Sequence, residues 1–519
     1  MLPEMTPPVE PFTGPYAQGA PAPALRIVAP SLTRFGAREL VRGAEIVAVL
    51  AVRLARAVGR FVVRRPRVVW RWRRDRTARA ELAVAASAGL VDGFMALGPT
   101  FVKLGQLIAS SPGMFPAPLA DACLRTLDNV PPFPAREALA IVEDDLGAAA
   151  GQVFRHFDPE PLSAASVAQV HACVLADGRE AVLKIQRPDI RERMNRDLRM
   201  MYRLARLVDR TRTGHLMNAP GVVEDLHQVT NEELNFALEA HRQDAFREHI
   251  TAFGDNRWVT APVVYWECCG PRVICMERLH GTPMDRFAEI KARGVDGELV
   301  LRRGLKVWME ATLVHGPFHG DVHAGNIWVL DDGRAAYLDF GIMGELPAAH
   351  REAVRDAQYT VMIDGDYTRI VRAWQRIGIL SDDVGPVDEV AARLKAVLDP
   401  MLDMTLGEVS LAFLLRQQLE LQREYSARAA RELVLVSKQL LYFERYAKEL
   451  APSYNMARDL FLLQNVFPEA VARLGAERGI TFPDDALPNA VTSPTEPARG
   501  PTRAAAAARA RSPAPGPLG

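Results

Sequence analysis

The sequence has few cysteines and no cysteine motif. Its 519 residues contain five cysteines, and no two of them form a CxxC pair. A disulfide framework or a cysteine-based zinc site is therefore not indicated, and reduced thiols in a cytoplasmic compartment are expected. The rest of the composition, 49% hydrophobic and 24% charged, is ordinary for globular proteins. Most of the chain is expected to fold, and its length suits about three or four domains.

Long apolar runs are also missing. A bilayer-spanning helix needs about 20 largely apolar residues. The run from Leu104 to Ala120 is interrupted by three prolines, and the run from Ile46 to Ala51 is closed by Arg53. The first 30 residues contain eight prolines and no apolar stretch before Arg26. Neither a transmembrane helix nor a signal peptide is predicted.

The chain has no net charge, with 63 basic and 63 acidic residues, yet its first 80 residues contain 15 arginines and five acids. Residues 64–76 alone hold seven arginines together with Trp70 and Trp72. Arginine mixed with tryptophan suits an anionic membrane surface, which residues 40–80 would contact. A solvated or internally paired face is the plain alternative. Nucleic acid is a less favoured partner, because no nucleic-acid-binding fold signature accompanies the charge.

Composition and periodicity divide the chain into six parts. Residues 1–33 and 481–519 are rich in Pro, Ala and Gly and are predicted to be disordered tails. An Arg-rich helical region (34–97) and a second helical region (98–150) precede a two-lobed α+β enzyme, with lobes at 151–280 and 281–480. Strands are expected at 169–175, 179–185, 263–269, 271–277, 327–330 and 335–338, and helices at 222–250, 284–315 and over most of 350–474.

The chemistry is concentrated in two motifs of the second lobe. Residues 319–326 fit the phosphotransferase loop H-x-D-x-x-x-x-N, and Asp339-Phe-Gly follows after one predicted hairpin. Phosphoryl transfer needs a metal held against the phosphates and a carboxylate near the acceptor. Asn326 and Asp339 can hold Mg²⁺, while Asp321 orients or deprotonates the nucleophile.

Three histidines in the same region have a spacing that would form a zinc stripe on a helix. They are His315, His319 and His323. Intervening glycines and a proline break any helix there, so metal ligation is not favoured. His319 is expected to brace the catalytic loop.

A lysine and two glutamates in the first lobe are predicted to form ion pairs. Lys184 ends a strand that resembles the kinase V-A-I-K strand. Glu233 lies on an apolar stripe of the helix predicted over 222–250, and Glu239 lies on another face of it. A carboxylate buried without a partner costs several kcal/mol, so two basic partners are implied. The loop before the lysine strand, Ser163 to Gln169, is rich in alanine where a kinase has glycines, so its shape should differ.

Together these residues resemble the UbiB (AarF) family of atypical protein-kinase-like proteins. The resemblance rests on the alanine-rich loop, the lysine strand continuing through Lys184 to Pro188, and the K-x-G-Q motif at Lys103 to Gln106, and it runs from Gly98 to Leu346. It implies a two-lobed protein-kinase-like fold with an N-terminal helical extension carrying the K-x-G-Q motif and a helical C-terminal lobe.

The resemblance also assigns roles to residues. Lys184 would pair with Glu239, and an E-x-D motif would engage Lys103 over the mouth of the site. Here that motif reads Glu233-Leu-Asn235, which leaves Lys103 with one carboxylate. Lys103, Gln106, Glu233 and Asn235 would thus regulate access. The implied ATP-binding residues are Ala164, Ala165, Ser166, Lys184, Met276, Glu277 and Leu279.

The implied function is an ATPase or phosphotransferase that uses ATP and Mg²⁺ and supports isoprenoid-quinone lipid metabolism, with a prenylated quinone or lipid precursor as partner. A nucleotide-gated scaffold without turnover and a small-molecule phosphotransferase are the alternatives. Many family members end in paired apolar helices, whereas this sequence does not. A cytoplasmic protein with peripheral membrane attachment is therefore expected, and the oligomeric state stays open.

Overall fold

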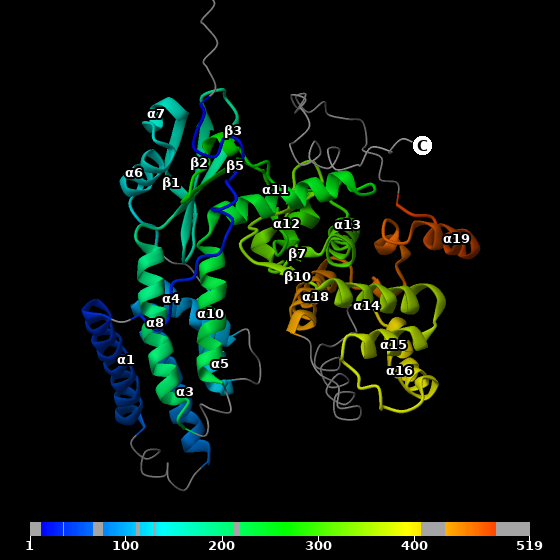
Figure 1. The fold of residues 1–519 in the computed structure, drawn as a ribbon, viewed down its shortest axis with the longest axis horizontal. Coiled ribbons are helices and arrows are strands. Elements are labelled where there is room, and N and C mark those ends of the chain that lie inside the picture. Colours follow the sequence, from blue (N-terminus) through cyan, green and yellow to red (C-terminus); the bar gives the residue numbers. More distant parts are fainter. Residues whose placement is uncertain are drawn as a thin grey trace, which may run out of the picture. The chain divides into compact units, whose positions relative to one another are not determined.

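The structure is a computed structural model (Figure 1). It describes residues 12–34, 36–65, 76–109, 115–127, 131–211, 218–405 and 431–483. Contacts divide the chain into two units, residues 1–481 and 482–519, and the description below concerns the first. The tail predicted at 481–519 lies almost wholly outside the described residues, as do residues 66–75 with both tryptophans of the arginine-rich segment.

The N-lobe is an antiparallel sheet in the order β1-β2-β3-β5. Its strands are β1 (Phe154–Ala164), β2 (Ala168–Leu175), β3 (Glu180–Gln186) and β5 (Val273–Glu277). The hairpin predicted at Asp177-Gly178 joins β2 to β3, and Gly178 has the positive φ of 95° that such a turn requires. Cys173 pairs with Ala181 across it. This part of the prediction is confirmed.

Helices pack against this sheet. Helix α6 (Ala135–Leu146) begins after Pro134 and ends at Gly147, whose φ of 67° and N–H bond to the Glu143 carbonyl close the last turn. The short α7 (Ala150–Val153) follows it, and α11 (Phe236–Ala252) contacts β5. Buried side chains of the strands, of α6 and of α11 form one apolar core, which also contains four of the five cysteines: Cys173, Cys268, Cys269 and Cys275.

An N-terminal strap, residues 12–33, packs mainly on the same lobe, with its last residues against the helix that carries Arg203, and corrects the predicted disorder for those residues. Tyr16 is 7% exposed and belongs to the N-lobe core. The N–H of Gly14 donates to the Glu267 carbonyl at 3.0 Å, and Arg203 donates to the Thr33 carbonyl at 3.0 Å. Composition missed this segment because a few side chains, Tyr16 with Phe12 and Leu25 among them, anchor it to the core while its average hydrophobicity stays low.

A helical unit precedes and flanks the N-lobe. It consists of α1 (Ala37–Arg64), α3 (Arg76–Leu97), α4 (Pro99–Ala109), α5 (Ala117–Cys123), η1 (Leu124–Leu127), α8 (Ile190–Val208) and α10 (Ala219–Glu233). Its core includes Val91, Leu97, Phe101, Cys123 and Leu198. The boundary expected at residue 97/98 therefore falls inside a packed unit, and the segment expected at 98–150 is divided, because α6 belongs to the N-lobe core.

A buried arginine fixes the first helix of this unit. Arg42 donates to both carboxylate oxygens of Asp197 at 2.7 and 3.2 Å and to the Leu97 carbonyl at 3.0 Å. The Thr100 hydroxyl donates to the same carboxylate at 2.9 Å. Although burial opposes the charge, the bonds from Asp197 and Glu45 raise the pKa of Arg42. Part of the N-terminal positive charge is therefore paired inside the protein. This agrees with the alternative of an internally paired face for that part.

The C-lobe contains a sheet in the order β4-β9-β8-β6, a β7-β10 pair and many helices. The strands are β4 (Val259–Thr260), β6 (Gly281–Pro283), β7 (Pro317–His319), β8 (Ile327–Leu330), β9 (Ala335–Tyr337) and β10 (Met343–Glu345). The longer helices are α12 (Phe287–Ala292), α13 (Gly297–Glu310), α14 (Ala348–Tyr359), α15 (Tyr367–Arg376), α16 (Val387–Leu402), α18 (Arg431–Leu450) and α19 (Pro468–Arg478). The shorter turns are η3 (Ala311–His315), η4 (Ala324–Asn326), η5 (Thr360–Asp364), η6 (Met456–Arg458) and η7 (Leu460–Leu463). The β8-β9 hairpin and the helices after His350 were predicted.

Three predicted elements differ in the structure. The helix expected over 284–315 is divided into α12, α13 and η3, with a break at residues 293–296. The helix expected over 222–250 is two helices, α10 and α11, separated at Leu234 and Asn235. Leu226 consequently belongs to the core of the helical unit, whereas Phe236 belongs to the N-lobe core, so the predicted stripe is not one face. The strand expected at 263–269 is a single bridge at Val264 followed by a short 3₁₀ turn, η2 (Trp266–Cys268).

Among the described residues, one helix has the length and apolar composition to cross a membrane. It is α3, with a mean hydropathy of 1.5 over its most apolar window. A third of that window is buried, and Val91, Phe94 and Leu97 contribute to the core of the helical unit. A core helix passes the same test, so α3 is no clear transmembrane span.

Candidate active site

Lys184 is the centre of a charged triad between the lobes. The strand β3 holds it opposite Ile274 of β5, and its side chain is 11% exposed. Its Nζ lies 2.6 Å from Glu239 Oε1 on α11 and 3.2 Å from Asp339 Oδ1. The expected pairing of Lys184 with Glu239 is present, and the same ammonium also contacts the predicted metal ligand.

The surroundings shift the pKa of all three groups. Burial alone would lower the pKa of Lys184, but the carboxylates of Asp339 and Glu239 raise it above its usual value, so the amine is charged. Burial also works against the Asp339 carboxylate, yet Lys184 and the Gly341 N–H lower its pKa to about 2. For Glu239, which is 1% exposed, burial outweighs Lys184 and raises the pKa to about 7. Asp339 is therefore the firmly ionised acid of the triad.

Asp339 has an unusual backbone conformation. Its φ is 57°, in the left-handed region, and its Oδ1 accepts the Gly341 N–H at 3.2 Å. Phe340 is fully buried, with its ring centroid 5.1 Å from that of Phe246 and 5.2 Å from that of His319. Left-handed residues with a side chain are uncommon and concentrate at functional sites. Half of the Asp339 side chain, 49%, stays exposed to solvent.

The catalytic loop is braced by its own histidine, as predicted. His319 is fully buried on β7, its Nε2 donates to the Leu338 carbonyl at 2.9 Å, and its Nδ1 accepts the Asp321 N–H at 3.2 Å. This arrangement requires a neutral imidazole, and burial accordingly lowers the His319 pKa. Asn326 is buried, and its Nδ2 donates to the Asp321 carbonyl at 3.0 Å. This hydrogen bond uses the amide nitrogen of Asn326 and does not involve its amide oxygen.

The other two histidines lie on different elements. His315 ends the π-helical turn η3, at the end of the helical stretch predicted over 284–315, and its ring stacks on that of His249 at 4.5 Å. His323 is half exposed, with its Nε2 3.6 Å from Asp321 Oδ2. No group of three side chains suited to a metal ion occurs among the described His, Cys, Asp and Glu residues.

The alanine-rich loop follows β1 and is tied to the preceding segment. The Ala165 N–H donates to the Ala168 carbonyl at 2.8 Å, and Arg187 donates to the Ala165 carbonyl at 2.9 Å. Gln169 exchanges two hydrogen bonds with the backbone of Phe133 at 3.0 and 3.2 Å. The loop that carries Ala164, Ala165 and Ser166 is thus a closed turn, consistent with a shape unlike that of a glycine-rich loop.

Three of the implied ATP-binding residues lie where the N-lobe sheet passes into the C-lobe sheet. Met276 and Glu277 end β5, and Leu279 lies between β5 and β6 of the C-lobe sheet. Met276 is 9% exposed, and its sulfur lies 3.6 Å from Gln243 Nε2. Their assignment to ATP binding stays a prediction.

Lys103 and Glu233 form the expected ion pair between α4 and α10. Their side chains are 9% and 17% exposed. Gln106 of the same motif donates to the Thr126 carbonyl at 3.2 Å, which ties α4 to η1. The K-x-G-Q motif thus joins the helical unit to the glutamate that lies just before the α10–α11 break.

The Asn235 side chain forms two hydrogen bonds, and neither involves Lys103. Its Oδ1 accepts the Leu238 N–H at 3.1 Å and caps α11, while its Nδ2 donates to the Arg26 carbonyl of the N-terminal strap at 3.2 Å. A carboxylate could form the cap but could not donate to Arg26. The amide therefore fits the strap, which the sequence comparison with the family motif did not show.

The donor set fits Mg²⁺ with ATP. Asp339 provides a half-exposed, ionised carboxylate, and Asn326 provides an amide oxygen, which are hard oxygen ligands of the kind that Mg²⁺ prefers. Asp321 lies in the same loop as Asn326 and is held by it. Lys184 lies beside Asp339, where it can contact phosphate oxygens.

The sequence prediction missed the part of the site that comes from α18. Gln439 and Lys438 of this helix contact the catalytic loop more than a hundred residues earlier in the chain. One signal was available: Gln439 is a polar residue in the apolar +4/+4/+3 series Leu435, Gln439, Phe443 and Tyr446. A glutamine on a buried stripe needs hydrogen-bond partners.

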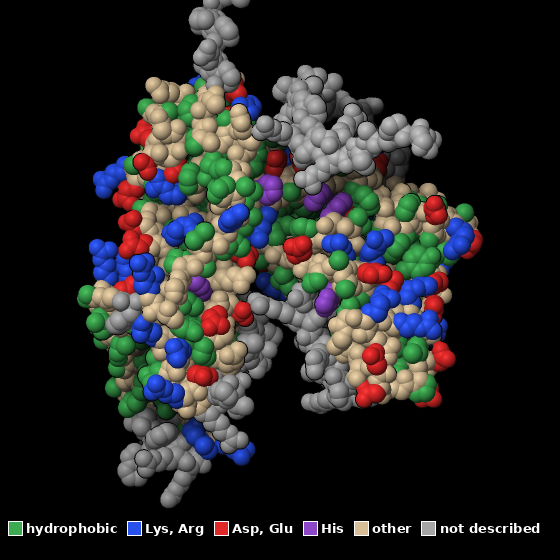
Figure 2. All heavy atoms as spheres, in the orientation of Figure 1, with side chains coloured by type: hydrophobic (Ala, Val, Ile, Leu, Met, Phe, Trp, Pro, Cys, Tyr) green, Lys and Arg blue, Asp and Glu red, His purple; other side chains and the backbone are tan. Residues whose placement is uncertain are grey.

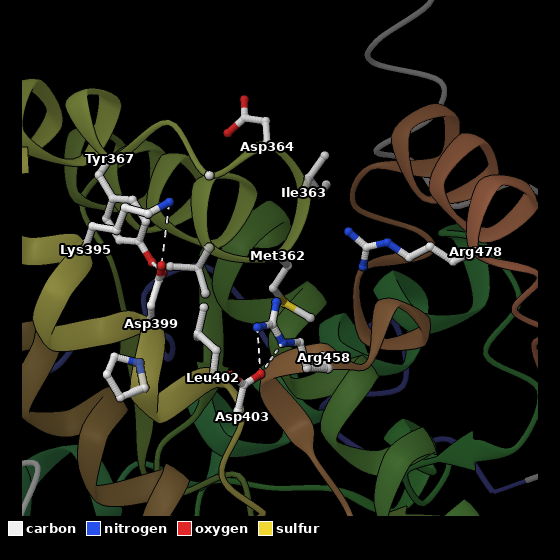
Figure 3. Close-up of a pocket in the computed structure, with 13 residues that line it drawn as sticks. Met362, Ile363, Asp364, Tyr367, Lys395, Asp399, Leu402, Asp403, Arg458 and Arg478 are labelled. Atoms are coloured by element: carbon white, nitrogen blue, oxygen red, sulfur yellow. Dashed lines mark hydrogen bonds and ion pairs between the residues drawn. The ribbon is translucent and has the colours of Figure 1, made fainter. Parts of the chain in front are cut away.

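A separate pocket of about 520 Å³ lies elsewhere in the C-lobe (Figure 3). None of its lining residues belongs to the predicted site. Its Lys395 and Arg458 are paired with Asp399 and Asp403 inside the pocket, as the dashed lines in Figure 3 show. These internal pairs involve two of the three basic residues that line the pocket, the third being Arg478.

Comparison with known proteins agrees with the motifs. The family model described as "ABC1 atypical kinase-like domain" matches residues 125–374, and the one described as "UbiB helical domain" matches residues 394–455. A probable protein kinase UbiB of Azotobacter vinelandii is 30% identical over 392 residues, which are 75% of this chain and 71% of the relative. The chain belongs to the UbiB family of atypical kinase-like proteins. The kinase-like fold class predicted from the sequence is confirmed.

Three further similar proteins come from Mycobacterium tuberculosis and Arabidopsis thaliana. An uncharacterised protein of Mycobacterium tuberculosis, Rv0647c, is 39% identical over 369 residues. These residues cover 70% of this chain and 75% of the length of Rv0647c. A chloroplastic aarF domain-containing protein kinase of Arabidopsis thaliana is 30% identical over 394 residues, covering 70% of this chain and 72% of its own. A solved structure titled as the Rv3197–erythromycin complex from M. tuberculosis covers 67% of this chain and 87% of its own, with 23% identity and a TM-score of 0.43.

Proposed function

We propose that this protein binds ATP with Mg²⁺ between its lobes and uses it in an ATPase or phosphotransferase reaction that supports isoprenoid-quinone lipid metabolism. The observation that carries the proposal is the triad of Lys184, Glu239 and Asp339, in which the left-handed Asp339 is half exposed. Asp339 and Asn326 would hold Mg²⁺, whose charge would neutralise the phosphates. The names of the UbiB relatives support a kinase-like role.

The residues around this site favour chemistry over passive binding. A scaffold that only binds nucleotide would not need Asp321 held on both sides by His319 and Asn326. Asp321 would orient or deprotonate the acceptor, and Lys184 would neutralise phosphate charge. The Lys103–Glu233 pair supports the regulatory role of the K-x-G-Q helix, because it joins α4 to the end of α10.

A peripheral membrane contact is the proposed partner surface. Helix α1 exposes the apolar residues Leu40, Val41, Val47, Val52 and Val63. Arg53, Arg56 and Arg60 are exposed on the same helix. Figure 2 shows basic and hydrophobic side chains together over the surface where Figure 1 draws α1. Apolar and basic side chains on one helix suit an anionic lipid surface, where a prenylated substrate would also reside.

The test is ATP consumption by the purified protein with and without anionic liposomes and a prenylated phenol. Phosphoprotein and phosphorylated small molecule are measured separately from free phosphate. Stimulation by the lipid and prenylated phenol, with free phosphate as product, supports an ATPase. A phosphorylated acceptor supports a phosphotransferase. Nucleotide binding without any turnover would favour the scaffold and contradict the enzyme.

A further inference from the structure

The catalytic loop has no strong cation of its own. Residues 319–326 contain neither lysine nor arginine. Two other lysines near the cleft already contact carboxylates, Lys184 with Glu239 and Asp339, and Lys103 with Glu233. Phosphoryl transfer builds negative charge on the transferring group and on the oxygens that it joins, and lysine or arginine side chains commonly stabilise that charge.

Helix α18 brings a cation to this loop. Lys438 Nζ lies 3.5 Å from Asp321 Oδ1, and the ring of Tyr442, one turn later, lies 5.9 Å from the same ammonium. His323 approaches the other carboxylate oxygen at 3.6 Å. The Lys438 side chain is 35% exposed, so it faces solvent as well as Asp321. A single, partly exposed pair of this length contributes little to stability, so a structural role explains the contact poorly.

The neighbouring residue holds the loop backbone. Gln439 is fully buried, its Oε1 accepts the Val322 N–H at 2.9 Å, and its Nε2 donates to the Gly320 carbonyl at 2.6 Å. Tyr446 donates to the Val322 carbonyl at 2.8 Å. Helix α18 thus forms hydrogen bonds with the backbone on both sides of Asp321 and places the Lys438 ammonium beside the Asp321 carboxylate.

We propose that α18 completes the active site. Lys438 is a catalytic residue that contacts the transferring phosphoryl group, and Gln439 is a positioning residue that fixes Asp321 through its neighbours. In the reaction the bond from the terminal phosphorus to the ADP oxygen breaks while a bond to the acceptor oxygen forms. The acceptor proton passes to Asp321 or to water. Lys438 keeps its proton and stabilises charge, and this inference rests on the proposed use of ATP.

The test compares Lys438→Met and Lys438→Arg with Lys448→Met, a control lysine on the same helix that pairs with Glu444. Lys438→Met should lower kcat for ATP consumption about 10²-fold, as removal of one preorganised charge typically does. KM for ATP should rise as well, because the terminal phosphate loses a contact that it already has in the bound ground state. Lys438→Arg should recover most of kcat. The melting temperature should be the same for all the proteins.

Binding provides a second readout that does not depend on turnover. Because Lys438 would contact the terminal phosphate, Lys438→Met should weaken affinity for ATP about tenfold more than affinity for ADP, each measured with Mg²⁺. Lys438→Gln serves if the methionine variant folds poorly. Equal kcat and equal ATP-to-ADP affinity ratios in Lys438→Met and Lys448→Met would overturn the role of Lys438 while the proposed function stood. A wild-type protein that binds neither nucleotide would overturn both.

Gln439 is tested by Gln439→Leu, which keeps bulk and removes both hydrogen bonds. It should lower kcat and the melting temperature together, and raise hydrogen exchange at the Val322 N–H. An unchanged kcat in a folded Gln439→Leu protein would contradict the positioning role.

Discussion

Asp339 holds a backbone conformation that costs a residue with a side chain on the order of 1–3 kcal/mol. The surrounding contacts fix it: Phe340 is buried between two aromatic rings, and Lys184 and the Gly341 N–H hold the carboxylate. Such a cost is retained where the side chain must point at a ligand. The first prediction concerns that carboxylate.

Asp339→Asn should abolish Mg²⁺-dependent ATP turnover, because it removes the charged metal ligand and keeps the shape. Phosphate release measured over a range of Mg²⁺ concentrations tests it. Asp332→Asn, in the exposed β8-β9 turn, is the matched control and should behave like the wild type. Wild-type turnover in Asp339→Asn would remove Asp339 from the metal site.

The buried pair of Lys184 and Glu239 should show strong coupling. Lys184→Met leaves the buried Glu239 with no ammonium partner, which should lower the free energy of unfolding by about 3 kcal/mol. Glu239→Gln with Lys184→Met should cost less than the two single changes added together. Denaturant unfolding of the four proteins measures the coupling. The exposed pair of Lys395 and Asp399 is the control and should couple by under about 0.5 kcal/mol. Additive effects at Lys184 and Glu239 would mean that the pair is not formed in solution.

Glu310 gives a pH dependence with a definite sign. It is 1% exposed and accepts hydrogen bonds from Asn256 at 2.7 Å and from Asn465 at 2.6 Å. Burial raises its pKa from 4.5 to about 7, although Lys306 and the two amides oppose the shift. The folded state therefore binds the proton more tightly than the unfolded state. Its stabilising contribution is complete below pH 4.5 and is lost as the pH rises through about 7, by on the order of 3 kcal/mol.

Glu310→Gln should flatten this part of the stability profile. Melting temperature measured from pH 4.5 to pH 8 tests it. Glu298→Gln, an exposed change on the same helix, should keep the wild-type slope. An unchanged slope in Glu310→Gln would assign the pH dependence to other groups.

At the scale of elements, the break between α10 and α11 separates two glutamates that pair with different lysines. The Leu234 carbonyl accepts Gln186 Nε2 at 3.0 Å and also accepts Arg191, while Asn235 begins the next helix. These bonds satisfy backbone groups that the broken helix leaves without partners. Glu233 then ends one helix and Glu239 lies in the first turn of the next, so one meets Lys103 and the other meets Lys184.

Asn235→Asp should loosen the N-terminal strap and should not tighten the Lys103 contact. A carboxylate facing the Arg26 carbonyl loses a hydrogen bond and adds repulsion, at a cost of about 1–3 kcal/mol. Hydrogen exchange should increase at residues 14–26 and stay the same at residues 100–109. Asn235→Ser, which keeps a capping oxygen and adds no charge, should show a smaller increase. Greater protection at 100–109 in Asn235→Asp would instead indicate a carboxylate that reaches Lys103.

The sequence predicted those elements whose signals are local. The Asp177-Gly178 turn, the β8-β9 hairpin and the motifs at Asp321 and Asp339 each depend on residues close together in the chain. The strap, the Arg42–Asp197 contact and the α18 contacts depend on partners more than a hundred residues apart. Periodicity also failed at Asn235, because a helix cap changes two backbone angles without interrupting the apolar pattern.

At the scale of the whole molecule, the exposed face of α1 should bind anionic vesicles. Changing Arg53, Arg56 and Arg60 together to Gln should weaken binding about 10²-fold, at roughly 1 kcal/mol per arginine, and binding should fall steeply with salt. Vesicle pelleting over a range of salt measures both. The same change at Arg334, Arg376 and Arg473 of the C-lobe is the control. Equal pelleting of the two triple variants would exclude α1 as the lipid-binding surface.

The distribution of thiols supplies internal reporters of how the molecule opens. Cys123 belongs to the core of the helical unit, the other four belong to the N-lobe core, and the C-lobe has none. All five are buried, so an alkylating reagent modifies each only when its own core opens. Pulsed labelling with mass spectrometry would therefore give separate opening rates for the helical unit and the N-lobe in the unmodified chain. A ligand bound between the lobes should slow labelling of the N-lobe thiols, and Cys123 would show whether the helical unit opens with them.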